Sequence, residues 1–110
     1  MTDKRLVLST CGSHEVATKI ARALVVGQIA ACVNVLGPME SVYRWKGTVE
    51  TSHEFLLVIK TRRKEFAGLQ RVIREMHSYE VPEIVALPIV AGSERFLAWL
   101  NEQTSAGPAS

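Results

Sequence analysis

The sequence has few cysteines, few aromatic residues and no large excess of charge of either sign. Two cysteines, Cys11 and Cys32, are too few for the disulfide framework of a small secreted domain, so reduced thiols are expected. Thirteen basic and eleven acidic residues give a formal net charge of +2, which is far from the basic excess of a dedicated nucleic-acid binder. No apolar run approaches the ~20 residues of a membrane span, and the first residues do not resemble a signal peptide. We therefore expect a cytoplasmic protein with no nucleic-acid partner and no membrane partner.

The sequence motifs of common enzymes are also missing. There is no G-x-S-x-G, P-loop, G-x-G-x-x-G or H-E-x-x-H segment. The three histidines, His14, His53 and His77, are not spaced four residues from one another or from a cysteine, which excludes a single-segment zinc site. The prediction is a protein that is not an enzyme and has no obligatory cofactor. Any metal site has to be assembled from residues that are distant in the sequence.

The composition is that of an ordinary soluble domain. Hydrophobic residues make up 47% of the 110 positions and charged residues 22%. This length suits one domain, and we assign it to residues 1–103. Residues 104–110 are small and polar, with nothing to bury, and are predicted to form a disordered tail.

Hydrophobic periodicity divides the domain into strands and helices. The predicted order is β-α-β-β-α-β followed by a C-terminal helix, an α+β arrangement of the ferredoxin-like type with two helices on one face of an antiparallel sheet. The predicted strands are Leu6–Thr10, Ile29–Leu36 continuing through Met39–Trp45, Thr48–Thr61 and Glu83–Val90. The first predicted helix lies between Ser13 and Gly27, the second runs from Phe66 to about His77, and the last follows Ser93.

Local signals mark the ends of these elements. Ser13 and Ser93 are predicted N-caps of the first and last helices. Gly27 is predicted to be the left-handed residue just past the first helix. Lys46-Gly47 is a candidate tight turn between the two long strands. Pro88 in the last strand implies an edge position or a bulge, because proline has no N–H to donate to a neighbouring strand.

The third predicted strand is apolar on both faces. Phe55, Leu57 and Ile59 lie on one face, and Leu56 and Val58 lie on the opposite face. Two helices cover only one face of such a sheet, whereas an antiparallel sheet normally leaves its other face polar. The simplest cover for the second face is another copy of the chain, which predicts a homo-oligomer. The alternative is a monomer whose C-terminal helix covers that face.

A cysteine and a histidine are the candidate metal ligands. Cys11 ends the first strand just before a helix N-terminus, a position that lowers the pKa of a thiol and favours the thiolate. His77 ends the second helix, and in a ferredoxin-like fold both positions lie at the same end of the sheet. A thiolate and an imidazole suit copper or zinc. The alternative is structural: a partly buried cysteine, and a histidine that interacts with the helix dipole. Cys32 lies in an apolar run and is predicted to be a core residue.

A basic cluster lies where the second helix begins. Lys60, Arg62 and Arg63 bring positive charge to a helix start, where it opposes the helix dipole. Either an acidic patch or a bound anion compensates this charge, or the cluster is simply a solvated face. The aromatic residues Tyr43, Trp45, Tyr79 and Trp99 are candidates to line a cleft or to fill the core and interfaces.

Several segments together resemble the divalent-cation tolerance protein CutA family. The similarity runs from about Leu6 to Asn101, with the motifs in the same order. The most specific segment is His77-Ser78-Tyr79-Glu80-Val81-Pro82-Glu83-Ile84. The other matching residues are Ala30-Ala31-Cys32-Val33-Asn34, Ser41-Val42-Tyr43-Arg44-Trp45-Lys46-Gly47, Glu50, Glu54, Lys60-Thr61, Pro88-Ile89 and Phe96-Leu97-Ala98-Trp99-Leu100.

The resemblance implies a ferredoxin-like fold in a tight homotrimer, similar in architecture to the PII signalling proteins. It also implies a role in tolerance of divalent metal ions, without enzymatic activity, and weak copper binding. The proposed copper ligands of the family are a cysteine at the end of the first strand and a pair of adjacent histidines. Here His77 matches one histidine and Met76 stands in place of the other. The family cysteine aligns with Thr10, one residue before Cys11.

The sequence is also compatible with two other functions. One is a PII-like binding module that holds a small anionic ligand between subunits, with Lys60, Arg62 and Arg63 as the contacts. The other is a structural trimer that serves as a scaffold for partner proteins.

Overall fold

The computed structural model describes residues 2–104, which form one four-stranded sheet and three α-helices. A 3-10 turn, Arg63–Glu65, leads into the second helix. The strands are β1 (Lys4–Cys11), β2 (Cys32–Trp45), β3 (Thr48–Arg62) and β4 (Val85–Pro88), and the helices are α1 (His14–Val26), α2 (Phe66–Met76) and α3 (Glu94–Gln103). The assignment of residues 1–103 to one domain stays a prediction. Of the predicted tail, residues 105–110 lie outside the described part of the chain.

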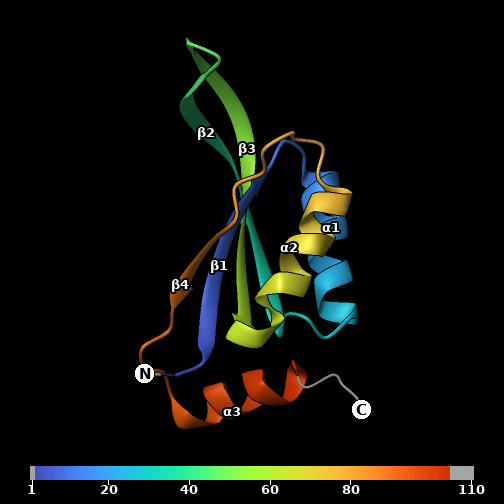
Figure 1. The fold of residues 1–110 in the computed structure, drawn as a ribbon, viewed down its shortest axis with the longest axis vertical. Coiled ribbons are helices and arrows are strands. Elements are labelled where there is room, and N and C mark those ends of the chain that lie inside the picture. Colours follow the sequence, from blue (N-terminus) through green and yellow to red (C-terminus); the bar gives the residue numbers. More distant parts are fainter. Residues whose placement is uncertain (1, 105–110) are drawn as a thin grey trace.

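The sheet has the strand order β2-β3-β1-β4, and every neighbouring pair is antiparallel. The two connections that contain α1 and α2 place both helices on the same face of the sheet, side by side (Figure 1). The predicted ferredoxin-like α+β fold is therefore confirmed. β4 lies at the edge, which explains how Pro88 is accommodated within it.

The hydrophobic core lies between this face and the two helices. Alternate residues of the central strands point toward the helices, among them Val7 of β1 and Leu57 and Ile59 of β3, and all three side chains are fully buried. Ile20 of α1 and Ile73 of α2 meet them from the other side. The fully buried large side chains of this core are Val7, Ile20, Leu24, Leu57, Ile59, Leu69 and Ile73.

The predicted caps are confirmed, but one predicted turn residue is wrong. The Oγ atoms of Ser13 and Ser93 accept hydrogen bonds from the third residue beyond each, as N-caps do. Gly27 has a φ of −79°, so it is not left-handed, and the positive φ of 58° belongs to the next residue, Gln28. Lys46 and Gly47 have φ values of 52° and 82°, as expected for a tight hairpin turn.

Two strands begin later than predicted. The backbone N–H groups of Ile29 and Ala30 both donate to the carbonyl of Leu24, so these residues finish the end of α1 and do not belong to the sheet. β2 therefore begins at Cys32, which is partly buried and lies outside the core cluster, contrary to the prediction. At the other end of the chain, β4 is only four residues long, whereas the sequence predicts eight from Glu83 to Val90.

A bulge at Gly37-Pro38 interrupts β2. Leu36 pairs with Leu56 and Met39 pairs with Glu54, so β2 has one residue more than β3 between these pairs. The φ of Gly37 is +145°, and a Cβ added there would lie 2.7 Å from the Phe55 ring, so only glycine fits. The extra residue keeps Leu36 and Met39 on the same face of the sheet.

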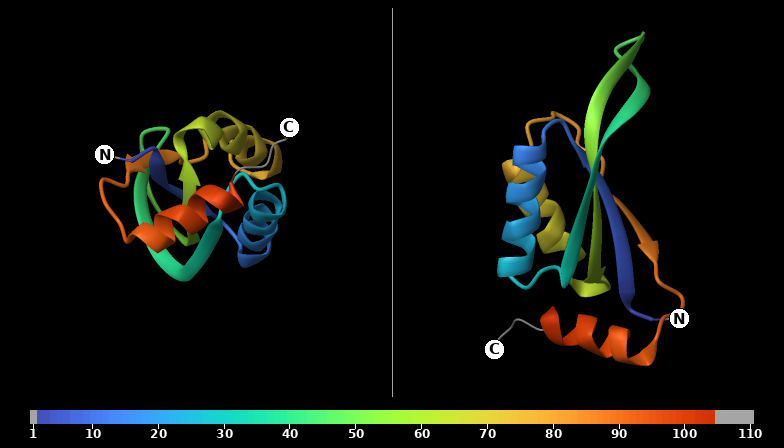
Figure 2. Two further views of the ribbon diagram at one scale, coloured as in Figure 1. Left: turned by 90° about the horizontal axis from the view of Figure 1, so that it is seen from below. Right: turned by 180° about the vertical axis from the view of Figure 1, so that it is seen from behind.

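Helix α3 lies across one end of the sheet and leaves the second face uncovered (Figure 1, Figure 2). Arg62, the last residue of β3, donates to the Asn101 side chain and to the Thr104 carbonyl. Thr104 is fully buried, whereas the sequence predicts that it belongs to the disordered tail. The alternative of a monomer whose C-terminal helix covers the second face does not agree with this position of α3.

The uncovered face is apolar, as predicted. It carries Leu8 of β1 beside Val58 of β3, and Val85 of β4, which is 46% exposed. Within residues 2–104 no helix lies over this face (Figure 2, right). We name the following residues the open face: Leu6, Leu8, Leu36, Leu56, Val58, Val85 and Leu87.

Candidate functional site

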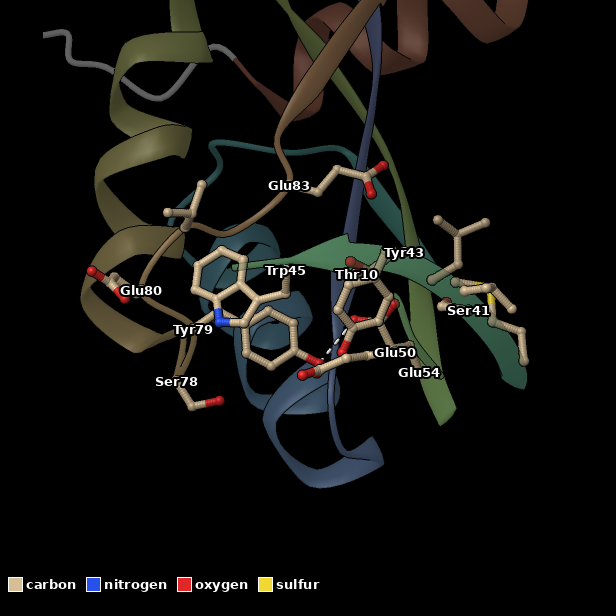
Figure 3. Close-up of a pocket in the computed structure, with 14 residues that line it drawn as sticks. Thr10, Ser41, Tyr43, Trp45, Glu50, Glu54, Ser78, Tyr79, Glu80 and Glu83 are labelled. Atoms are coloured by element: carbon tan, nitrogen blue, oxygen red, sulfur yellow. Dashed lines mark hydrogen bonds between the residues drawn. The ribbon is translucent and has the colours of Figure 1, made fainter. Parts of the chain in front are cut away.

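A hollow of about 760 Å³ lies where the β2–β3 hairpin meets the end of β1 and the segment 78–83 (Figure 3). The hairpin extends beyond β1, because the residues of β3 before Phe55 pair only with β2. The segment 78–83 supplies the opposite wall. The hollow is lined by Thr10, Met39, Ser41, Val42, Tyr43, Trp45, Glu50, Glu54, Leu56, Ser78, Tyr79, Glu80, Val81 and Glu83.

Tyr79 and Glu54 form the central hydrogen bond of this hollow. The Tyr79 hydroxyl donates to Oε2 of Glu54 over 2.8 Å, drawn as a dashed line in Figure 3. Burial raises the pKa of the Tyr79 hydroxyl well above its usual value of 10.0, and the hydrogen bond to the Glu54 carboxylate and its negative charge raise it further. The hydroxyl therefore stays protonated as a donor to Glu54. Gly12 lies close by, since a Cβ added there would be 3.0 Å from the Tyr79 hydroxyl.

His77 uses both of its ring nitrogens within the chain. Nε2 lies 2.6 Å from the backbone carbonyl of Thr10, which can only accept, so Nε2 carries the proton. Nδ1 accepts a hydrogen bond from the backbone N–H of Tyr79 over 3.0 Å. These two bonds fix the ring orientation and connect the end of α2 to the end of β1. Neither nitrogen has a lone pair free for a metal ion in this arrangement.

Cys11 is fully buried on the face of the sheet that packs against the helices. Burial, with a smaller contribution from the negative charge of Glu54, raises the pKa of the Cys11 thiol from 9.0 to about 11. The prediction that the adjacent helix N-terminus favours the thiolate is therefore wrong, because the cost of burying a charge exceeds the effect of the helix. Thr10, the preceding residue, faces the hollow instead.

A copper ion suits the donor types of Cys11 and His77 but not their arrangement. A thiol and an imidazole are good copper ligands only when the sulfur is deprotonated and a nitrogen lone pair is free. Met76, at the position next to His77, is 37% exposed and does not lie in the core. Among residues 2–104 no three His, Cys, Asp or Glu side chains gather closely enough to hold a metal ion.

The raised pKa of Cys11 predicts a loss of stability at alkaline pH. A thiol whose pKa is higher in the folded than in the unfolded protein stabilises the fold fully below about pH 9, and this contribution is lost as the pH rises toward about 11. A shift of this size corresponds to about 3 kcal/mol in the free energy of unfolding. Urea unfolding at pH 8 and pH 10.5 measures the loss. We expect Cys11→Ala to lose less stability over this range than the wild type, and equal losses would contradict this explanation.

The basic cluster is largely engaged with the protein itself. The Arg62 guanidinium is buried, and besides its bonds to Asn101 and Thr104 it lies 3.7 Å from the Glu65 carboxylate. Lys60 donates to the Asn34 side chain. Arg63 is exposed. Of the three residues predicted to bind an anion, Arg63 is thus the most accessible. The anion site stays a prediction.

The acidic residues of the hollow were not predicted as site residues from the sequence. The alternation of Met39, Ser41, Tyr43 and Trp45 is visible in the sequence and places Tyr43 and Trp45 on one face. Glu50 and Glu54 lie on the same face, because Glu50 pairs with Tyr43 and Glu54 with Met39. The tight turn at Lys46-Gly47, which the sequence predicts, sets this register, because the pairing continues from Trp45 and Thr48 to Met39 and Glu54. No helix within residues 2–104 is long and apolar enough to cross a membrane.

The comparisons with known proteins agree on one family. The model of the family described as "CutA1 divalent ion tolerance protein" matches residues 5–103. The "Divalent-cation tolerance protein CutA" of Thermus thermophilus is 46% identical over 101 residues, which is 92% of this chain and 98% of that protein. The chain spans about half the length of several plant and mammalian relatives, such as 54% of "Protein CutA, chloroplastic" of Arabidopsis thaliana, to which it is 41% identical over 90% of its own length.

Solved structures of such proteins have the same fold. The divalent cation tolerance protein Cut A1 of Thermus thermophilus superposes with a TM-score of 0.91, covering 93% of this chain and 99% of that one at 46% identity. A structure described as the periplasmic divalent cation tolerance protein CutA from Archaeoglobus fulgidus has a TM-score of 0.90 at 37% identity, with the same two coverages.

Proposed function

We propose, from the premise that this chain belongs to the CutA1 divalent ion tolerance protein family, that it serves in tolerance of divalent metal ions as a homotrimer without enzymatic activity. We place it in the cytoplasm. Both of its cysteines, Cys11 and Cys32, are free thiols, as is usual in a reducing compartment. The open face of the sheet is the observation that supports the proposed homotrimer.

The open face needs a cover that the described residues of one chain do not provide. Leu36 is 50% exposed and Leu87 is 41% exposed, and both belong to a continuous apolar surface that crosses all four strands. A surface of this kind on a soluble protein marks an interface. The long hairpin adds Val42 and Val49, which are 65% and 60% exposed beyond the end of β1. Cyclic closure of three copies covers each open face without leaving one at the end of the assembly.

The first test is the mass of the protein in solution. Light scattering at micromolar concentration should give about three times the chain mass of 12.2 kDa. A mass of one chain would contradict the assembly, and a mass of two chains would contradict cyclic closure by three. Dilution to nanomolar concentration is the matched control, because an assembly that forms only at high concentration would dissociate there.

Copper binding through Cys11 and His77 is a separate part of the proposal, and we expect it to be weak. Copper must displace the Thr10 carbonyl from Nε2 of His77 and must remove the proton from a thiol with a pKa of about 11. The test is a titration with Cu(I) under reducing conditions. We expect weak binding in the wild type, weaker still at lower pH because protons compete, and none in Cys11→Ser or His77→Ala. Equal binding by all three proteins would show that these residues are not the ligands.

A further inference from the structure

The hollow beside the hairpin is acidic, although the chain as a whole is basic. Four glutamates line it, Glu50, Glu54, Glu80 and Glu83, and no lysine, arginine or histidine does. The chain has thirteen lysines and arginines against eleven acidic residues, so the charge of the hollow is opposite in sign to the formal net charge of +2. The three ion pairs of residues 2–104 involve other carboxylates. The hollow therefore attracts positive charge that the described chain does not itself supply.

Glu54 shows this most clearly, because its side chain is more than nine-tenths buried. The residue is 7% exposed, and its Oε2 accepts only from the Tyr79 hydroxyl. The other carboxylate oxygen, Oε1, has no donor among the described residues, and the side chain lines the hollow. No described lysine, arginine or histidine forms an ion pair with this carboxylate. A cation in the hollow would supply that partner.

Three aromatic rings accompany the carboxylates. Tyr43, Trp45 and Tyr79 all line the hollow and are 37–40% exposed, so part of each is open to solvent. Figure 3 shows the three rings with Glu50 and Glu54 near them. Aromatic faces attract organic cations, and ammonium groups are held by aromatic rings and carboxylates together. Apolar side chains, among them Met39 and Val81, complete the lining and provide contacts for an alkyl chain.

A single metal ion is a poor match for this arrangement. No three of the described acidic, cysteine or histidine side chains converge at metal-ligand distances, so the four glutamates are spread over the walls. The volume of about 760 Å³ is within the ~300–1,000 Å³ range of small-molecule sites. A ligand with several separated positive charges and apolar segments between them matches the spread carboxylates, the rings and the apolar lining together.

We infer that the hollow binds an aliphatic polyamine, a small organic cation with two or more ammonium groups joined by alkyl segments. One ammonium group lies against Glu54 and the Tyr79 ring, and a second is placed by Glu50 near Tyr43 and Trp45. This site is distinct from the metal ligands proposed above. It does not depend on copper binding by Cys11 and His77.

The experiment is a titration of the full chain, in its assembled form, with spermidine as the probe. Calorimetry measures binding, and Trp45 fluorescence in a Trp99→Phe background reports whether the hollow is occupied. We expect saturable binding, a change in Trp45 emission, and no binding of 1,8-octanediol, a neutral chain of similar length. Magnesium chloride at matched ionic strength should leave most of the binding intact, because a compact ion does not span the separated carboxylates.

Two glutamates on the same hairpin provide matched variants. Glu54→Gln keeps the shape and the acceptor for Tyr79, and we expect it to weaken spermidine binding about tenfold or more, as the loss of a charged hydrogen bond does. Glu40→Gln removes the same charge from the opposite face, since Glu40 pairs with His53 and does not line the hollow. We expect it to change binding less than about twofold. Glu50→Gln is the second variant to use if Glu54→Gln does not fold.

Three results would overturn the inference. The first is no saturable binding of spermidine at millimolar concentration. The second is equal weakening by Glu40→Gln and by the variants of the hollow, which would show general attraction to a charged surface. The third is an assembled wild type that does not bind while Glu54→Gln changes the mass of the assembly. That result would show that a basic side chain of a second copy of the chain occupies the hollow.

Discussion

We expect the replacement of Leu57 by aspartate to abolish the folded state. Leu57 is fully buried at the centre of the sheet, on the face that packs against α1 and α2, and it pairs with Ser9 and Val35. Losing the leucine side chain costs about 2–5 kcal/mol, and a carboxylate buried without a partner adds several more. The sum is comparable to the whole stability of a small domain, about 5–15 kcal/mol. Circular dichroism should show no cooperative thermal transition at neutral pH.

Leu57→Met is the matched control for this experiment. It keeps nearly the same volume and apolar character, so the free energy of unfolding should fall by less than about 1.5 kcal/mol. A Leu57→Asp protein with a cooperative transition close to that of the wild type would show that this residue is not in the core. Because folding and assembly are linked by mass action, we expect Leu57→Asp to lose the assembly together with the fold.

Replacement of Val58, the next residue in β3, by aspartate should break the assembly and leave the fold of the single chain intact. Val58 points to the open face, where it pairs with Leu8 and Asn34 and is only partly buried in one chain. In the proposed trimer, Val58→Asp places a charge in a dry interface, at a cost of several kcal/mol, which weakens association at least about a hundredfold. In the single chain the carboxylate stays hydrated. We expect light scattering to give one chain mass, 12.2 kDa, with the circular dichroism of a folded protein.

Val58→Thr tests whether charge, and not a change of shape, breaks the assembly. Threonine has nearly the shape of valine, so most of the trimer should persist at micromolar concentration. If Val58→Asp still has the mass of three chains, the open face is not the interface, and the hairpin alone must hold the copies together. The two aspartate variants differ by one position in β3, and they test the two faces of one strand.

Much of the fold could be predicted from the sequence because its signals are local. The helical spacing of apolar residues in α1 and α2 and the caps at Ser13 and Ser93 depend on a few neighbouring residues. The end of α1 could not be predicted as well. Gly27 is the residue type expected in a left-handed turn, but the backbone reverses at Gln28, where Ile29 and Ala30 still bond to the helix. Which residue adopts the positive φ depends on the path of the backbone after the last turn of the helix.

The candidate site was harder to predict, because it depends on burial and on contacts between segments that are distant in the sequence. Cys11 precedes a helix, which suggests a reactive thiolate, but the strand turns this side chain toward the core and burial raises its pKa. His77 was predicted from its place at the end of the second helix and from the resemblance, but its hydrogen bonds to Thr10 and Tyr79 appear only in three dimensions. The meeting of Glu54 with Tyr79 joins residues 25 positions apart in the chain. No spacing rule in the sequence indicates that contact.

The bulge at Gly37-Pro38 lets the two halves of β2 share one face of the sheet. From Trp45 back to Met39 the register follows from the turn at Lys46-Gly47, so Tyr43 lies beside Glu50. On the other side of the bulge, Leu36 pairs with Leu56. In a regular strand the three-residue step from Leu36 to Met39 would put these two side chains on opposite faces. The extra residue therefore makes the open face and the carboxylate wall of the hollow one continuous side of the sheet, although even-numbered residues of β2 supply one half and odd-numbered residues the other.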